Sequence, residues 1–189
     1  RIQGLKEGIL AGQFPVKVQP GWLNGYGYGV SVFYGDMFLY LPAFLALVGF
    51  PIQTAYQIYM LAVNAVTCLL AYCCFKKIFK SDGIGLLASM LYTLAPYRLT
   101  CLFVRGAVGE YTALAFLPLI FYGLFVIFTE EEENCHKGII AAVIGYSGLI
   151  QTHILSCEMT GFITIVFCVV LWRRVIRPKR FLALAKVVI

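Results

Sequence analysis

Residues 55–75 read AYQIYMLAVNAVTCLLAYCCF and are followed directly by Lys76 and Lys77. These 21 positions carry no charged residue, and an uncharged apolar run longer than about 18 residues is typical of a helix that crosses a bilayer. A basic pair at the end of such a run is typical of its cytoplasmic end. The segment therefore predicts one complete membrane-spanning helix.

The whole chain has a composition unlike that of a soluble domain. Of its 189 residues, 61% are hydrophobic and 13% charged, and the mean hydropathy is +0.85, whereas soluble domains are roughly half apolar and a quarter charged. The net charge of +6 could indicate a nucleic-acid partner, but the basic residues are confined to short clusters at the ends of apolar runs. We therefore expect membrane lipid as the partner and no nucleic acid.

The other apolar runs predict further spans. Residues 84–104 would return across the membrane with a bend at Pro96, and residues 111–129 would form a third span. Residues 138–172 are long enough for a tight helical hairpin that turns near Ser156. The chain would thus cross the membrane five times.

Two parts are predicted, a loop at residues 1–53 and a transmembrane domain at residues 54–189. Residues 37–50 are apolar, but 14 residues at ~1.5 Å each cover about 21 Å of a hydrocarbon core of ~30 Å. We expect this segment to lie at the membrane surface; if it crossed instead, the first loop would change sides. The predicted fold class is all-α, a polytopic transmembrane helix bundle whose amino-terminal loop carries short surface helices.

The ends of the chain also carry an expectation. The sequence opens at Arg1 without a methionine and stops inside a new apolar stretch, residues 181–189. We therefore expect a piece of a longer protein in which a sixth span begins at this carboxyl end.

The distribution of Lys and Arg predicts the orientation. The loops after residues 75, 129 and 172 hold nine of these residues, and the other side holds five: Arg1, Lys6, Lys17, Arg98 and Arg105. Cytoplasmic loops carry the excess of Lys and Arg, so residues 1–53 are expected outside the cytoplasm. The predicted location is the cytoplasmic membrane, with several passes.

This topology gathers ionisable residues from four separated stretches on the outer face: Asp36, Arg98, Arg105, Glu110, His153 and Glu158. An ionised side chain at the bilayer centre costs ~2.5 to 3.5 kcal/mol on insertion scales, so these residues should lie near the interface or line a wet cavity.

Each of them has a structural and a functional interpretation. Arg98 and Arg105 could be interfacial anchors or a clamp for a lipid-borne phosphate. Glu110 lies in the sequence RGAVGE, where glycines allow a turn that joins carboxylate and guanidinium. Asp36 precedes an apolar helix and could be an N-cap or a catalytic carboxylate. His153 could be satisfied by a neighbouring carbonyl or act on a substrate.

Aromatic side chains and a cysteine–histidine pair complete the candidates. Trp22 and Tyr34 fit an interfacial belt, and such rings also stack on sugars. Cys135 and His136 follow the glutamates of residues 130–133, yet this is a poor metal site on a solvated cytoplasmic loop. No metal ligand and no cofactor are predicted, and dependence on a divalent metal is left open.

Several short motifs resemble a known family. They are GQFP at residues 12–15, GYGY at 25–28, FYGDMFLYLP at 33–42, PYR at 96–98, RGA at 105–107, Glu110, and LP at 117–118. In order and spacing they resemble the bacterial membrane domain called 6-pyruvoyl-tetrahydropterin synthase-related. That domain looks like part of the YfhO-like membrane proteins, which are similar to GT-C glycosyltransferases.

The resemblance implies an enzyme that uses polyprenyl-phosphate sugars outside the cytoplasmic membrane. It also implies a catalytic carboxylate early in the first outer loop; since no acidic residue precedes Glu7 here, that residue is expected upstream of Arg1. Pterin chemistry is not predicted, because the sequence shows no soluble zinc–histidine site.

Roles for individual residues follow from the chemistry of transfer from a lipid phosphate. Glu110 or Asp36 would accept the proton of the acceptor. The substrate-binding candidates are Arg98, Arg105, Tyr97, His153, Tyr34 and Trp22. The alternatives to a glycosyltransferase-like protein are a lipid or polysaccharide transporter or flippase, and a non-catalytic envelope protein.

Overall fold

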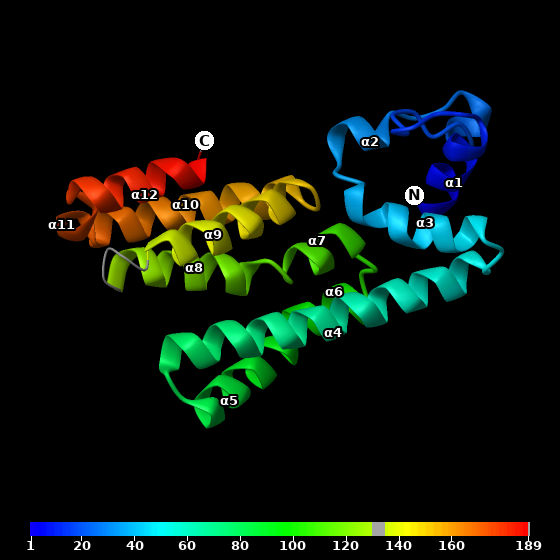
Figure 1. Cartoon of the computed structure of the whole chain (residues 1–189). Helices are drawn as coiled ribbons and strands as arrows, with labels where there is room; N and C mark the ends of the chain where they lie inside the picture. Colours follow the sequence, from blue (N-terminus) through cyan, green and yellow to red (C-terminus); the bar gives the residue numbers. More distant parts are fainter. Residues whose placement is uncertain (130–134, 189) are drawn as a thin grey trace.

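The computed structural model describes residues 1–129 and 135–188. Within them the regular elements are helices, and one isolated antiparallel bridge joins Gln19 to Tyr28 (Figure 1). The elements are α1 (Ile2–Leu10), η1 (Leu23–Gly25), α2 (Val30–Phe33), η2 (Met37–Leu39), α3 (Tyr40–Leu47), α4 (Ile52–Phe79), α5 (Asp82–Thr93), α6 (Pro96–Phe103), α7 (Val108–Ala113), α8 (Leu117–Thr129), α9 (Cys135–Ile150), α10 (Ile154–Val170), α11 (Trp172–Val175) and α12 (Pro178–Val188). The predicted all-helical class is confirmed for this part of the chain.

The longest helix, α4, forms a hairpin with α5. It ends where Lys80 adopts a left-handed backbone conformation (φ 52°), and Ser81 then caps α5 by accepting a hydrogen bond from the Ile84 N–H (3.4 Å). The two helices approach closely at Gly85, where an added Cβ would lie 2.6 Å from the Lys76 Cα. The tight turn and the glycine contact hold α4 and α5 antiparallel.

A bend separates α5 from α6. The two helices meet at 44° across a break of a few residues, with Pro96 at the first position of α6. Proline has no N–H to donate and disfavours helical geometry in the residue before it. The bend predicted at Pro96 is confirmed.

Within residues 1–129 and 135–188, two segments are long and apolar enough to cross a membrane, Ile52–Phe79 and Val108–Thr129. A third arises if the bent pair α5 and α6 counts as one span. Among the described residues, α9 and α10 are shorter apolar helices of 16 and 17 residues. The structure thus supports two or three spans by length, fewer than the five predicted.

The predicted turn near Ser156 is wrong by a few residues. The chain breaks between Ile150 and Ile154 because His153 adopts an extended backbone and caps α10 with its side chain. The Nδ1 atom of His153 accepts a hydrogen bond from the Ser156 N–H (3.3 Å), so Ser156 lies inside the first turn of α10.

At the carboxyl end, where a sixth span was expected to begin, α12 has 11 residues. It packs along α9 and α8. Ala183 is buried against Ile127 and Cys135.

Residues 1–51, the amino-terminal unit, fold onto the start of α4 (Figure 1). Leu5 and Val16 are almost fully buried and share one apolar cluster with Tyr59 and Tyr111. The short helices expected here are present, and the apolar segment Met37–Leu47 is shorter than a span. The unit therefore covers the end of α4 that lies far from the α4–α5 turn.

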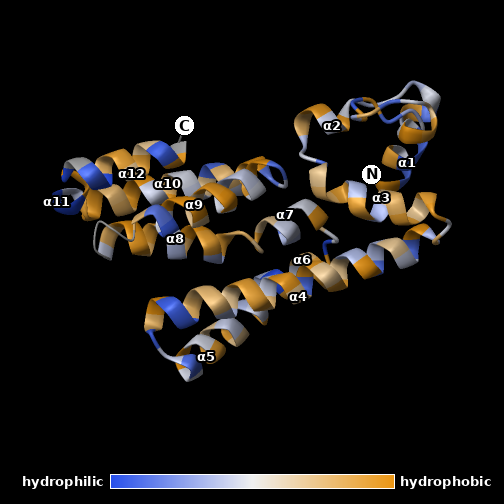
Figure 2. Cartoon of the chain, in the orientation of Figure 1, coloured by the Kyte–Doolittle hydropathy of each residue, from blue (hydrophilic) through white to orange (hydrophobic). Residues whose placement is uncertain are grey.

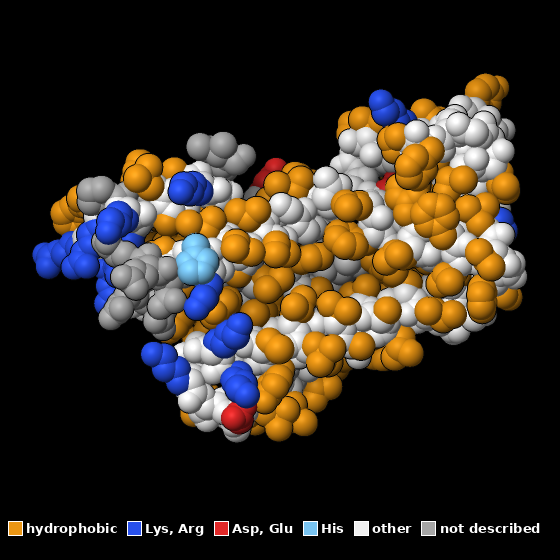
Figure 3. Space-filling view, in the orientation of Figure 1, with side chains coloured by type: hydrophobic (Ala, Val, Ile, Leu, Met, Phe, Trp, Pro, Cys, Tyr) orange, Lys and Arg blue, Asp and Glu red, His pale blue; other side chains and the backbone are white. Residues whose placement is uncertain are grey.

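The molecule has one strongly basic end. Figure 2 shows hydrophobic residues along most of α4 and α8, with hydrophilic ones at the α4–α5 turn and around α11. Figure 3 shows Lys and Arg side chains gathered at that end and an apolar surface over much of the rest. We call this the basic end; the amino-terminal unit lies at the other.

Candidate functional site

Three side chains of the α6–α7 region form a polar cluster at the surface. The Arg105 Nη1 lies 3.0 Å from Glu110 Oε2, and the Tyr97 hydroxyl donates a hydrogen bond to Glu110 Oε1. Arg105 also donates to the Tyr97 hydroxyl (3.4 Å). We call these residues the Arg105 cluster. Its arginine and tyrosine are about half exposed, which makes them accessible to a ligand.

The backbone after α6 creates this arrangement. Gly106 has a positive φ of 57°, and the Ala107 N–H donates to the Cys101 carbonyl (3.0 Å). The chain reverses in a few residues, so Glu110 in α7 returns to Arg105. The hydrogen bond to Tyr97, followed by the charge of Glu110, raises the pKa of Arg105, so this residue stays cationic.

Asp36 is buried and paired with Arg1. It occupies the N-cap position of η2 but makes no side-chain cap hydrogen bond; its Oδ1 forms an ion pair with Arg1 Nη2 instead. Arg1 also donates to the Gly35 carbonyl (2.9 Å) and lies over the Tyr34 ring, 5.7 Å from its centre. Asp36 therefore occupies the predicted N-cap position, but its carboxylate binds Arg1 and does not cap the helix.

Glycines bring three distant segments together beside this pair. A Cβ added at Gly35 would overlap the Gln151 carbonyl, and one added at Gly109 would lie 2.9 Å from the Thr152 carbonyl. A small cavity of about 10 Å³ remains between them. The first loop, α7 and the α9–α10 turn therefore meet where the helices α8 to α10 approach the amino-terminal unit (Figure 1).

Arg98 lies in the interior and not at the surface. It is 2% exposed, and its guanidinium donates to Asn64 Oδ1 (2.9 Å), the Thr93 carbonyl (3.1 Å) and the Tyr111 hydroxyl (3.0 Å). The guanidinium also stacks on the Tyr111 ring, 4.4 Å from its centre. Arg98 thus ties α4, α5, α6 and α7 together, and its role in substrate binding stays a prediction.

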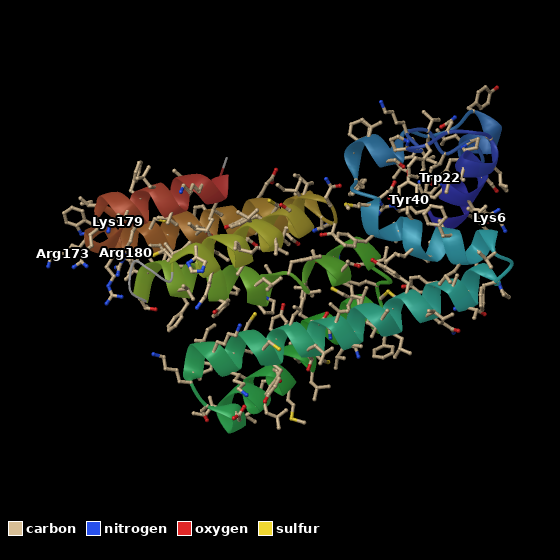
Figure 4. All side chains as sticks on the ribbon, viewed as in Figure 1. Lys6, Trp22, Tyr40, Arg173, Lys179 and Arg180 are labelled. Carbon is tan, nitrogen blue, oxygen red and sulfur yellow. The ribbon has the colours of Figure 1, made fainter. Side chains whose placement is uncertain are left out.

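The remaining candidates are not part of the Arg105 cluster and contact residues close to them in the sequence or in their own helix. His153 caps α10, and its Nδ1 lies 2.8 Å from the Ser156 hydroxyl. Trp22 lies in the amino-terminal unit (Figure 4). Its ring packs against that of Tyr28, with ring centres 5.8 Å apart. Glu158 is exposed on α10.

Sequence reasoning missed Asn64 and Tyr111 as partners of Arg98, and Arg1 as the partner of Asp36. The available signal was Asn64 itself, a polar amide inside an apolar run of 21 residues. Buried polar groups need hydrogen-bond partners, so this residue indicated a polar contact within the bundle. The sequence did not indicate which residue would form the hydrogen bond with Asn64.

The described residues give no group of three or more His, Cys, Asp or Glu side chains that could hold a metal ion. The sequence analysis considered Cys135 and His136 together with the glutamates at positions 130–133. Those glutamates lie outside the described residues.

Comparisons with known proteins place the chain in a family. The family model described as "6-pyruvoyl-tetrahydropterin synthase related domain; membrane protein" matches residues 32–189. No curated protein matches the chain, and neither does any solved structure. The match covers most of the chain, and the apolar helices of suitable length agree with it. The chain belongs to the 6-pyruvoyl-tetrahydropterin synthase related family of membrane domains.

Proposed function

We propose that this chain is part of a glycosyltransferase-like protein of the bacterial cytoplasmic membrane that acts on polyprenyl-phosphate-linked sugars. Residues 1–53 and the Arg105 cluster would lie on the outer face, since the basic end carries the excess of Lys and Arg expected of a cytoplasmic side. The observation that carries the proposal is the contact between a half-exposed guanidinium, that of Arg105, and the carboxylate of Glu110.

The two charges supply the two functions that such a transfer needs. A guanidinium stabilises the departing lipid phosphate, and a carboxylate accepts the proton of the acceptor hydroxyl. In the ion pair, the Glu110 carboxylate takes up the guanidinium that would bind a phosphate, and Arg105 takes up the carboxylate that would accept a proton. A substrate phosphate that binds Arg105 would take over that contact and release Glu110 to act as a base.

The transfer would replace one bond at the anomeric carbon of the sugar by another. The acceptor oxygen forms a bond to the anomeric carbon of the sugar while its proton passes to Glu110. The bond between that carbon and the phosphate oxygen breaks, and the lipid phosphate leaves with the electron pair beside Arg105. Asp36, which is buried and ion-paired, would then support the loop rather than take part.

The test is sugar transfer by the full-length protein in proteoliposomes. Glu110→Gln should lower kcat by about 100-fold or more, because a general base is lost, and should leave donor binding intact. Arg105→Ala should lower kcat/KM by roughly 100-fold, because a phosphate contact is lost. Transfer at the wild-type rate by both variants would refute the assignment.

Thr100→Ala is the matched control. Thr100 is exposed on the same helix as Tyr97, and its hydroxyl donates to the Pro96 carbonyl within that helix (2.8 Å). This variant should transfer sugar like the wild type. A comparable loss in the control would indicate a general effect on folding.

A transport function is the second candidate, and one feature favours it. Transporters place buried polar groups at broken helices, and Arg98 contacts the last residue of α5, directly before the α5–α6 bend, together with Asn64 in the middle of α4. Movement of the lipid-linked sugar between leaflets without an acceptor, retained in Glu110→Gln, would favour transport over transfer.

A further inference from the structure

The amino-terminal unit exposes large apolar side chains on one of its segments. In α2, in η2 and in the first turn of α3, four of them are 61 to 71% exposed: Val32, Phe33, Met37 and Leu41. We call these four residues the apolar tip. In Figure 1, α2 and the start of α3 lie on the side of the unit that is nearest the basic end. Exposed apolar side chains that gather in this way mark an interaction site.

The stretch of chain that carries the tip has almost no charge. From residue 18 to residue 51 the only charged residue is Asp36, whereas about a quarter of the residues in a soluble domain are charged. The Asp36 side chain is buried and forms an ion pair with Arg1. This stretch therefore presents no exposed ionised side chain, which suits contact with lipid better than contact with water.

The position of Tyr59 along α4 gives a depth in the bilayer. Lys76 and Lys77 follow the apolar run of α4 and mark the headgroup level at the basic end. Tyr59 lies 17 residues before Lys76, which is about 26 Å at ~1.5 Å per residue, and the hydrocarbon core is ~30 Å thick. Tyr59 therefore lies inside the core, close to the boundary that is far from the basic end.

Helix α3 brings the apolar tip to the level of Tyr59. The chain reverses between Leu47 and Ile52, so α3 runs back along α4 and packs on it. Leu39 and Ala43 belong to the same buried cluster as Tyr59. The tip lies around the start of α3, so the bilayer that surrounds α4 at this level also meets the tip.

We propose that the apolar tip inserts into the membrane leaflet opposite the basic end, at the boundary between the hydrocarbon and the headgroups. The partner is phospholipid, whose acyl chains would surround Phe33 and Met37. Surface segments of this kind bury their apolar side chains ~5–10 Å into that boundary. The unit is then held by the bilayer as well as by α4. This anchoring does not depend on the function proposed for the Arg105 cluster.

The experiment places an NBD fluorophore, which reports polarity, on single cysteines of the full-length protein in phosphatidylcholine nanodiscs. On Phe33→Cys and on Met37→Cys its emission should shift to the blue, and lipid with a doxyl group near the headgroup end of the acyl chain should quench it about twofold or more. The control is Lys6→Cys, at the far end of the amino-terminal unit (Figure 4). There the emission should stay close to that in water, without quenching by the lipid.

A change at Phe33 tests the insertion itself, with the fluorophore on Met37→Cys. Phe33→Asp should lower the quenching by the doxyl lipid roughly threefold or more, because burial of the phenyl ring is lost and an ionised group is excluded from hydrocarbon. Phe33→Leu is the matched control and should retain the quenching. Since Phe33 is exposed, neither change removes a core side chain.

Three results would overturn the proposal. Emission like that in water on both Phe33→Cys and Met37→Cys would place the tip in solvent. A blue shift without quenching by the doxyl lipid would mean that protein, and not lipid, covers the tip. Quenching on Met37→Cys that Phe33→Asp leaves unchanged would show that the tip does not determine the insertion.

Discussion

At Arg98, one guanidinium joins acceptors from three separate parts of the chain. Its partners are Asn64, Thr93 and Tyr111, and the residue is almost fully buried. A planar fork with several N–H donors can reach three acceptors at once, whereas the single ammonium of lysine cannot reproduce that geometry. Arg98 is therefore placed to stabilise the fold by a network and not by a single pair.

Arg98→Ala should destabilise the protein by on the order of 3 kcal/mol, since three hydrogen bonds from a charged group at a buried position are lost. Arg98→Lys should recover little of this loss. The measurement is thermal unfolding in detergent. Arg105→Lys, a similar change at an exposed arginine, should unfold near the wild-type temperature; an Arg98→Ala protein that does the same would contradict the structural role.

The Arg105 cluster was more accessible to prediction than Arg98. Arg105 and Glu110 are five positions apart, and the glycines of RGAVGE predicted a turn that would join them; the observed distance is 3.0 Å. Asn64 and Arg98 are 34 positions apart. Pairing over that separation depends on which helix faces meet, which no local pattern reports.

At the scale of helices, the contact between α8 and α9 depends on small residues. A Cβ added at Gly123 would lie 2.6 Å from the Gly138 carbonyl and 2.7 Å from the Ala142 nitrogen. Small residues let helices approach closely in membranes, where packing replaces the hydrophobic driving force. The two backbones are in contact here, so no flexible side chain can move aside.

Gly123→Ala should therefore destabilise the protein by about 1 to 3 kcal/mol, the usual cost of overpacking. Gly161→Ala is the matched control, because nothing lies within 4 Å of the Cβ that it adds; it should be neutral or slightly stabilising through higher helix propensity. Both are measured by thermal unfolding of the purified protein. Equal melting temperatures for the two variants would show that α8 and α9 are not in close contact.

At the scale of the whole molecule, the basic end and the amino-terminal unit lie at opposite ends (Figures 3 and 4). Arg173, Lys179 and Arg180 mark the first, and Lys6 and Trp22 the second (Figure 4). In a membrane this polarity predicts a cytoplasmic basic end. Both the proposed outer site and the direction of any transfer depend on this orientation.

Cysteine labelling of intact cells tests the orientation, in a background without the seven native cysteines. An impermeant maleimide should label Lys17→Cys from outside and should label Arg173→Cys only after the membrane is permeabilised. Both side chains are exposed, so access depends on the membrane and not on burial. The opposite pattern would place the Arg105 cluster in the cytoplasm and remove the basis of the transferase proposal.

The sequence by itself determined the properties that are local along the chain. Apolar runs and basic clusters predicted a helical membrane protein with one basic end, and Pro96 predicted the α5–α6 bend, because hydropathy and backbone restriction act within a few residues of one another. Only the tertiary structure decided which polar groups meet, such as Arg98 with Asn64 and Asp36 with Arg1. Those contacts join residues far apart in sequence, and the packing of helix faces that brings them together has no signature in any single segment.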